Sequence, residues 1–234
     1  MAPSIQSFND ETIYFTSLNY AIHQGQFDGV STVKSLRSKG DFGLGSESRL
    51  KGELVVLDGA FFSIDSEGKA RLMEDGDSIA YAAIKSFTPD TRLSIENISS
   101  MEDLEELLAE QIDQNSFAAI KVHATFHTIY LRSFEEQQKP YRTVDEVPEI
   151  KFDREDIKGT MVGYYTPRSA EVLNSPVFHF HFIDDHKTTG GHVLDIDLSK
   201  GSVEIDFAKE VHVQLPDTKS TDHVDLNTKI KSKG

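Results

Sequence analysis

The chain has 234 residues, enough for one large domain or for two small lobes that share a core. Its 24 Lys and Arg residues are outnumbered by 39 Asp and Glu residues, which gives a formal net charge of −15. Such a chain is a poor candidate for binding nucleic acid or an anionic membrane, because both need clustered basic residues. Cysteine is absent, which excludes disulfides and thiolate ligands, so a metal here would be held by His, Asp or Glu.

The longest apolar runs are far too short to span a membrane, and the N-terminal residues lack the basic start and apolar core from which a signal peptide would be expected. We therefore expect a cytoplasmic globular protein. Residues 1–12 are expected to form a flexible leader and residues 217–234 a C-terminal tail. Between them, residues 13–216 are expected to form a single catalytic domain with two lobes, at about 13–150 and 151–216.

The N-terminal part of the chain predicts short strands around one helix. A strand is expected over residues 13–18, followed by a helix over residues 31–39 in which apolar residues recur at helical spacing. Gly40 stands where a helix C-terminal glycine belongs. The Gly-rich stretch 40–46 that it opens is expected to be irregular.

A tight hairpin is the clearest local prediction. The dipeptide Asp58-Gly59 is typical of a two-residue turn, and it joins apolar segments that predict strands over residues 53–57 and 60–64. Residues 78–98 alternate loosely between apolar and polar side chains, which predicts strands interrupted at Pro89.

The second half of the chain predicts one further helix and many strands. Ser100 is expected to cap a helix whose apolar stripe begins at Leu104, and the polar residues 135–156 are expected to form a connection. Strands are expected over residues 117–125, 128–134, 161–166, 177–183, 192–198, 203–207 and 211–215. Because strands and helices do not alternate regularly, we predict a strand-rich α+β fold, with mixed or antiparallel sheets in two closely packed lobes and a few helices.

Three histidines form the densest chemical signal. His179 and His181 share one face of a predicted strand, because successive side chains in a strand point to opposite faces. If the next strand pairs with it as an antiparallel hairpin in which facing residue numbers sum to 373, His181 faces His192. Three imidazoles then converge, and three protein ligands with an open fourth position are typical of a catalytic zinc site. An exposed polar strand face is the alternative interpretation of the His-x-His pattern.

A second metal site is a weaker possibility in the same sequence. His123 and His127 are four residues apart in a predicted strand, so they would share a face. No nearby acidic ligand supports a metal there, and we do not expect one.

Several sequence blocks occur in a specific order along the chain. They are Phe27-Asp-Gly29, Gly40-Asp-Phe-Gly-Leu-Gly45, Gly52-Glu-Leu-Val-Val-Leu-Asp-Gly59, Arg132-Ser-Phe134 with Gln138 and Pro140-Tyr141, His179-Phe-His181, and Gly190-Gly-His192. Together they resemble the alpha-acetolactate decarboxylase family over residues 25–216. The resemblance implies a two-lobed fold, a homodimer and a zinc enzyme that converts 2-acetolactate to acetoin and carbon dioxide.

The resemblance also implies the metal ligands. His179, His181 and His192 would bind zinc, which would chelate the substrate hydroxyl and ketone oxygens and stabilise the enediolate left when carbon dioxide departs. No organic cofactor is needed, because the ketone of the substrate accepts the electron pair.

Three further residues acquire roles only through the resemblance. Arg132 would orient the substrate carboxylate through its planar guanidinium, and Glu53 would assist protonation of the product. Ser46 stands where the family often has Thr and would contact the substrate. Without the resemblance, Arg132 would be interpreted as a surface ion pair and Glu53 as an exposed strand residue.

One departure concerns the C-terminal tail. Some family members bring a glutamate from this tail toward the metal, but residues 217–234 contain no Glu. The remaining candidates in the tail are Asp217, Asp222, His223 and Asp225.

Two alternative functions stay open at this point. One is a non-catalytic relative of the same fold that binds a metal or a small molecule. The other is a cupin-like iron enzyme, which would need a Glu shortly after the second histidine, where this chain has Asp184 and Asp185 at a different spacing.

Overall fold

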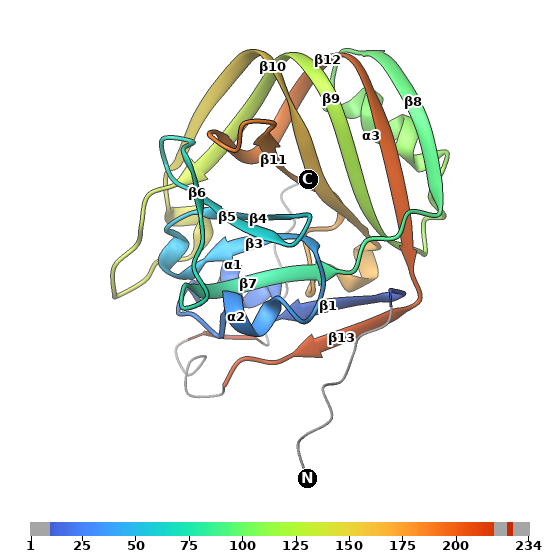
Figure 1. Ribbon diagram of the computed structural model, residues 1–234. Coiled ribbons are helices and arrows are strands. Elements are labelled where there is room, and N and C mark those ends of the chain that lie inside the picture. The colour runs from blue at the N-terminus through green and yellow to red at the C-terminus, as the bar shows by residue number, and fades with distance from the viewer. Residues whose placement is uncertain (1–9, 218–223, 227–234) are drawn as a thin grey trace.

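Two β-sheets packed against each other form most of the computed structural model, which describes residues 10–217 and 224–226 (Figure 1). The strands of the first sheet are β1 (Thr12–Thr16), β2 (Ser31–Thr32), β3 (Phe42–Glu47), β4 (Glu53–Leu57), β5 (Ala60–Ile64), β6 (Ala70–Leu72), β7 (Ser78–Lys85) and β13 (Glu210–Gln214). Their order is β13-β1-β7-β3-β4-β5-β6, and β2 pairs with β7. The β1–β13 pair is parallel and the other pairs are antiparallel, so this is a mixed sheet, as predicted.

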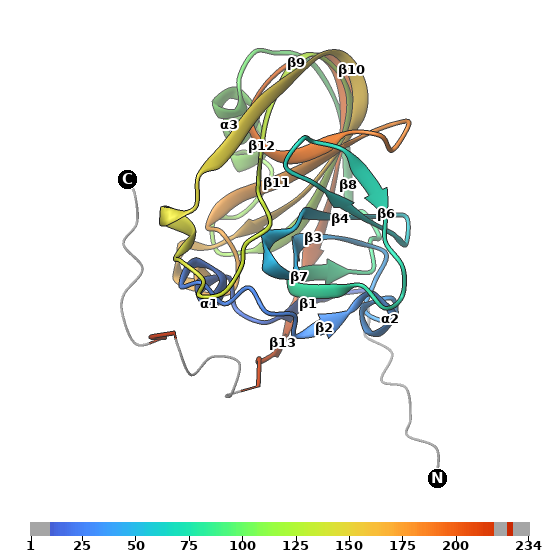
Figure 2. The same cartoon turned by 90° about the vertical axis from the view of Figure 1, so that its left-hand side faces the viewer.

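The second sheet contains the longest strands of the protein. They are β8 (Thr91–Ile98), β9 (Phe117–Phe134), β10 (Glu149–Thr166), β11 (Val177–Asp184) and β12 (Gly190–Ala208). The order is β11-β10-β9-β12-β8, and a further pairing between β11 and β12 closes four of these strands into a ring. Figure 2 shows that β9, β10 and β12 bend strongly and arch away from the first sheet.

Helices are short and lie at the edges of the sheets. They are α1 (Asn19–His23), α2 (Val33–Leu36) and α3 (Met101–Ala109), with 3₁₀ turns η1 (Ser48–Leu50), η2 (Val144–Glu146) and η3 (Arg168–Ala170). Helix α3 begins after Ser100 as predicted, because the Ser100 hydroxyl accepts a hydrogen bond of 3.0 Å from the backbone N–H of Asp103. None of the helices in the described ranges has the length and apolarity needed to span a membrane.

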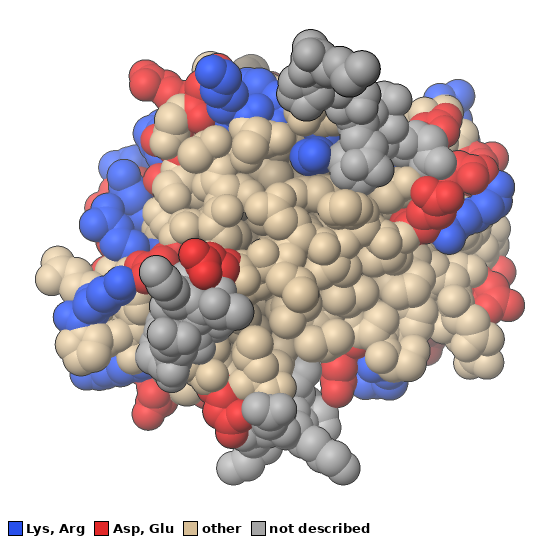
Figure 3. All heavy atoms as spheres, turned by 90° about the horizontal axis from the view of Figure 1, so that it is seen from below, with Lys and Arg blue, Asp and Glu red and all other residues tan. Residues whose placement is uncertain are grey.

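The sheets are held together by an apolar core and by one buried ion pair. Side chains of both sheets, among them Phe15 and Tyr164, form one cluster, and α3 covers a second cluster inside the second sheet. Lys85 of β7 is fully buried, and its Nζ lies 2.7 Å from Oδ2 of Asp206 on β12. Seen from below, the surface is largely uncharged at its centre and most charged side chains lie around its rim (Figure 3).

The hairpin predicted at Asp58-Gly59 is confirmed, with strands β4 and β5 at the predicted bounds. Both turn residues have positive φ, 51° at Asp58 and 75° at Gly59, as a type I′ turn requires. The strand-rich fold class is confirmed as well.

The Gly-rich stretch 40–46 is not irregular, and the prediction was wrong there because residues 42–47 form β3. Glycine is needed for close approach to β7: a Cβ added at Gly43 or Gly45 would lie 2.3 or 2.1 Å from a backbone oxygen of that strand. The helix predicted over residues 31–39 is shorter and ends at Leu36, so Gly40 does not terminate it.

Several predicted strands are parts of longer ones. Residues 117–125 and 128–134 form the single strand β9, and residues 192–198 and 203–207 lie in β12. The predicted connection over residues 135–156 ends sooner, since β10 begins at Glu149. A lobe boundary near residue 150 does not coincide with the sheets, because β8 and β9 precede it and belong to the second sheet.

Candidate metal centre

The three histidines of the sequence pattern lie together where β11 pairs with β12. The antiparallel register places His181 opposite His192, which confirms the predicted pairing. His179 lies two residues before His181 and therefore on the same face of β11. The intervening Phe180 points to the other face and is buried in the core of the second sheet.

The imidazole rings converge closely enough to share one ligand. Their ring centroids are 5.0 to 5.3 Å apart, and one ring nitrogen from each lies within 4.8 Å of the other two. His179 and His181 are buried, whereas His192 is half-buried. In the described part of the chain, this is the one group of three or more potential ligands.

Hydrogen bonds fix which nitrogen of two histidines faces the centre. The Nδ1 of His179 lies 3.0 Å from Oδ1 of Asn174, and the Nδ1 of His181 lies 2.9 Å from the carbonyl oxygen of Leu54. Both partners are acceptors, so each Nδ1 carries the proton and donates it. The two Nε2 atoms are then unprotonated, and they face each other at 3.2 Å.

Burial keeps the cluster neutral. Desolvation lowers the pKa of His179 and His192 well below the usual value and also lowers the pKa of His181, with the positive charge of Arg132 acting in the same direction on all three. For His181, the nearby carboxylate of Glu53 opposes part of this effect. Neutral imidazole is the form that binds a metal.

A divalent metal fits this donor set. Two lone pairs directed at each other across 3.2 Å repel unless a cation lies between them. Nitrogen ligands about 2.0–2.1 Å from a tetrahedral zinc lie about 3.3 Å from each other, which is close to the observed separation. The three histidines leave at least one position open, as in catalytic sites of this type.

Glu53 and Arg132 lie beside the histidines and contact each other. Glu53 is the first residue of β4, and its Oε2 is 3.5 Å from the Nε2 of His181. Arg132 on β9 is the cross-strand neighbour of His192, and its Nη1 is 3.1 Å from Oε1 of Glu53. Its Nε lies 3.3 Å from Oε1 of Glu149. The structure therefore brings together a cation and a carboxylate, the two residues to which the resemblance gave roles, at one edge of the histidine cluster.

Ser46 is the third predicted residue near this edge. It is paired with Glu53 in the β3–β4 ladder, and its hydroxyl donates a hydrogen bond of 3.0 Å to the carbonyl oxygen of Glu47. The hydroxyl oxygen keeps its acceptor capacity.

A cavity of about 90 Å³ joins these groups. Its polar lining includes the three histidines, Glu53, Arg132 and Ser46, and its apolar lining includes Ile22, Leu50, Phe134 and Val144. The cavity lies between the two sheets, since Glu53 and Ser46 belong to the first and the histidines to the second.

Three residues of this region were not found from the sequence. His23 and Tyr81 line the cavity, and Asn174 contacts His179 from a loop. Burial lowers the pKa of His23, while the charge of Asp145 opposes that change. No sequence motif surrounds any of these three residues. They come close to the histidine cluster only through the tertiary fold.

Other predicted candidates lie away from the centre. His123 is 3.1 Å from Asp185 on the outside of the second sheet, and His127 is exposed. Asp217 of the tail is also exposed, whereas Asp222 and His223 lie outside the described residues. Asp225, the remaining tail candidate, is exposed as well.

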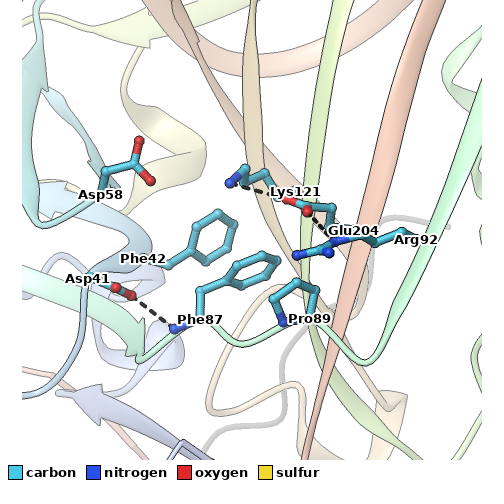
Figure 4. Close-up of a pocket in the computed structure, with 8 residues that line it drawn as sticks. All are labelled: Asp41, Phe42, Asp58, Phe87, Pro89, Arg92, Lys121 and Glu204. Atoms are coloured by element: carbon cyan, nitrogen blue, oxygen red, sulfur yellow. Dashed lines mark hydrogen bonds and ion pairs between the residues drawn. The ribbon is translucent and has the colours of Figure 1, made fainter.

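A second cavity, of about 200 Å³, opens on another side of the junction between the sheets (Figure 4). Phe42 and Phe87 stack there with centroids 4.5 Å apart. Its two cations share one partner, because Lys121 and Arg92 lie 3.2 and 2.7 Å from the carboxylate of Glu204. It therefore lacks the ligand cluster of the histidine cavity.

The fold and the centre define a two-sheet protein with a buried three-histidine site. Residues 13–228 match the family model described as alpha-acetolactate decarboxylase. The alpha-acetolactate decarboxylase of Brevibacillus brevis is 36% identical over 215 residues, which cover 91% of this chain and 75% of that protein. The crystal structure of the enzyme from Bacillus subtilis strain 168 matches with a TM-score of 0.89 at 31% identity, covering 93% of this chain and 94% of the other.

The chain belongs to the alpha-acetolactate decarboxylase family. An alpha-acetolactate decarboxylase from Methanosarcina mazei is 32% identical over 219 residues, which cover 92% of this chain and 76% of that protein. The resemblance seen in the sequence is thereby confirmed, and the chain is an enzyme of the carboxy-lyase class.

Proposed function

We propose that this protein is a zinc-dependent decarboxylase that converts 2-acetolactate to acetoin and carbon dioxide. The observation that carries the metal dependence is the pair of unprotonated Nε2 atoms of His179 and His181, which face each other at 3.2 Å beside His192. The names of the relatives support the substrate.

His179, His181 and His192 are the residues that would hold the metal. Bound there, zinc would supply Lewis-acid chemistry at the substrate ketone and would lower the energy of the negative charge that develops on it. The neutral ligands suit this role, because they do not reduce the charge of the cation. By holding the metal, the three histidines also determine where the ketone of the substrate must lie.

Arg132 orients the carboxylate that leaves as carbon dioxide. Its Nε and Nη1 face Glu149 and Glu53, so the guanidinium plane is held in place by two carboxylates. The scissile bond must stand out of the ketone plane for its electron pair to enter the carbonyl, and a fixed guanidinium can enforce that geometry. Arg132 thus contributes orientation rather than tight binding of the ground state.

Glu53 assists the proton transfer that completes the reaction. When the bond to carbon dioxide breaks, the electron pair moves to the ketone oxygen, and a proton must then arrive at the former carboxyl-bearing carbon. The carboxylate of Glu53 lies 3.5 Å from the Nε2 of His181 and can hold a water molecule that gives its proton to that carbon, with the proton replaced from solvent. Delivery from one side yields one enantiomer of acetoin.

The remaining cavity wall accommodates the substrate. The hydroxyl oxygen of Ser46 is an acceptor for the substrate hydroxyl, and Val144 and Phe134 offer apolar contact to the methyl groups. A small cavity enclosed in this way limits the length of the acyl group that can bind.

The test is acetoin formation from racemic 2-acetolactate by the purified chain, measured as isolated, after treatment with a chelator and after zinc is added back. We expect activity that disappears with the chelator and returns with zinc. Activity that survives complete metal removal would refute the metal dependence. A folded, zinc-loaded protein that forms no acetoin would favour the non-catalytic alternative.

We also propose the homodimer and the cytoplasmic location that the sequence and the family resemblance predict. Light scattering on the purified chain tests the dimer, and a monomer at micromolar concentration would contradict it.

A further inference from the structure

The three histidines differ in what holds the ring nitrogen that points away from the centre. His181 donates its Nδ1 proton to the backbone carbonyl of Leu54, and His179 donates to the side-chain amide of Asn174. For His192, the described residues offer no hydrogen-bond partner. Only one of the three rings is therefore oriented by a side chain that a substitution can remove.

Asn174 is buried and its amide is fixed from both ends. Its Oδ1 accepts from His179 at 3.0 Å and from the hydroxyl of Tyr81 at 3.0 Å, while its Nδ2 donates to Oγ1 of Thr166 at 3.2 Å. The side chain of Asn174 is fully buried. With its nitrogen directed at Thr166, the amide presents its oxygen to His179.

We propose that Asn174 is a positioning residue that keeps His179 in the tautomer with its Nε2 lone pair directed at the metal. This inference rests on the proposed metal-dependent function. A hydrogen bond to the outer nitrogen of a ligating histidine fixes the ring and its tautomer, and its loss typically weakens metal binding about 10- to 100-fold.

The chemical nature of Asn174 adds a second consequence. Carboxylates often occupy this position at metal sites, where they increase the basicity of the histidine. An amide orients the ring without adding negative charge, so the cation keeps more of its Lewis acidity. Asn174 thus favours a reactive metal over a tightly held one.

Tyr81 links Asn174, and through it the orientation of His179, to the first sheet. It lies on β7 of the first sheet, and its single hydroxyl proton is shared between the carbonyl oxygen of Leu173 at 2.7 Å and Oδ1 of Asn174 at 3.0 Å. The loop that carries Asn174 is therefore attached to the first sheet, while His179 belongs to the second. The orientation of the ligand depends on the packing of one sheet against the other.

The experiment measures the dissociation constants of zinc and cobalt by chelator competition, together with the visible spectrum of the cobalt form and kcat. We expect Asn174→Leu to bind zinc about 10- to 100-fold more weakly than the wild type and to have an altered cobalt spectrum. Asn174→Asp should bind zinc more tightly and have a lower kcat. Asn115→Leu, at an exposed asparagine far from the centre, serves as the matched control and should match the wild type.

Outcomes separate this inference from the proposed function. A wild-type chain that binds no zinc would refute the proposed function itself. A wild type that binds zinc, together with Asn174→Leu and Asn174→Asp variants that bind it equally well, would overturn the role of Asn174 alone. If Asn174→Leu fails to fold, Asn174→Asp decides the question, because aspartate has nearly the same shape as asparagine. Its zinc dissociation constant is expected to fall below that of the wild type, and an unchanged constant would overturn the role of Asn174.

Discussion

Replacement of Arg132 by Met gives the sharpest test of how the cavity acts on its substrate. The guanidinium is largely enclosed, with a side-chain exposure of 16%, and its Nε and Nη1 are engaged by Glu149 and Glu53. Among the described residues its Nη2 has no partner, so that nitrogen and the second N–H of Nη1 remain for the substrate carboxylate. The variant removes both of these donors at once.

The expected size of the effect follows from those two donors. Each charge-assisted hydrogen bond to the carboxylate contributes about 1.5–3 kcal/mol, so the loss of both donors and of the orientation that they impose should cost Arg132→Met up to about 3–6 kcal/mol in kcat/KM. At 1.4 kcal/mol per tenfold change, that is a decrease in kcat/KM of about 10²- to 10⁴-fold. Arg132→Lys retains the charge and one donor, so its decrease should be about 10- to 100-fold.

The assay compares kcat and KM for acetoin formation in the zinc-loaded variants. Arg92→Met is the matched control, because Arg92 lines the other cavity and is paired with Glu204 (Figure 4). We expect it to stay within about twofold of the wild type, since surface ion pairs contribute little. A variant at Arg132 that raises KM and leaves kcat unchanged would refute the orienting role, because uniform binding affects only KM.

Three other expectations concern the stability of the protein. Lys85→Met leaves the buried carboxylate of Asp206 without its cation and should lower the free energy of unfolding in urea by about 3–5 kcal/mol; a loss below about 1 kcal/mol would contradict a buried pair. Gly45→Ala should lower both the melting temperature and activity, because its Cβ would lie 2.1 Å from the carbonyl oxygen of Tyr81; an unchanged melting curve would disprove that contact. In the metal-free protein, burial lowers the pKa of His23 below its unfolded value of about 6.5. The neutral imidazole of His23 therefore contributes its full stability above that pH, and this contribution is lost as the pH falls and the unfolded chain binds a proton more readily than the folded one. His23→Phe should therefore reduce the slope of unfolding free energy against pH by up to about 1.4 kcal/mol per unit below pH 6.5, and an identical slope would argue against the shift.

The parts of the fold that the sequence predicts well are set by local chemistry. Asp58-Gly59 adopts the positive φ values that a two-residue hairpin turn needs, and the strands on both sides follow directly from it. The register between His181 and His192 was an assumption at the level of sequence, because a hairpin pairs residues whose numbers have a constant sum but does not fix that sum; the structure has the assumed register.

The parts that the sequence does not predict depend on distant contacts. The glycines of β3 resemble a loop in isolation, and only the close approach of β7 makes a strand of them. Strand β12 was divided into two because its middle is polar, and the structure bridges that region with register shifts between Asp197 and Leu198 and between Leu198 and Lys200. Asn174 was missed for the same reason, since its contact with His179 requires a loop to pack against the other sheet.

The charge of the cavity explains how an acidic protein can bind an anionic substrate. The net charge of −15 would oppose such a substrate if the field at the cavity followed the field of the whole surface. Inside the cavity, however, Glu53 is paired with Arg132, and burial keeps the three histidines uncharged. A dication held there would face the substrate with its charge undiminished by anionic ligands, in surroundings where electrostatic attraction is stronger than in water. The amide of Asn174, in a position where a carboxylate would also orient His179, preserves that charge. Neutral ligands at the centre would therefore leave the charge of a bound cation available to the substrate, although the surface as a whole is acidic.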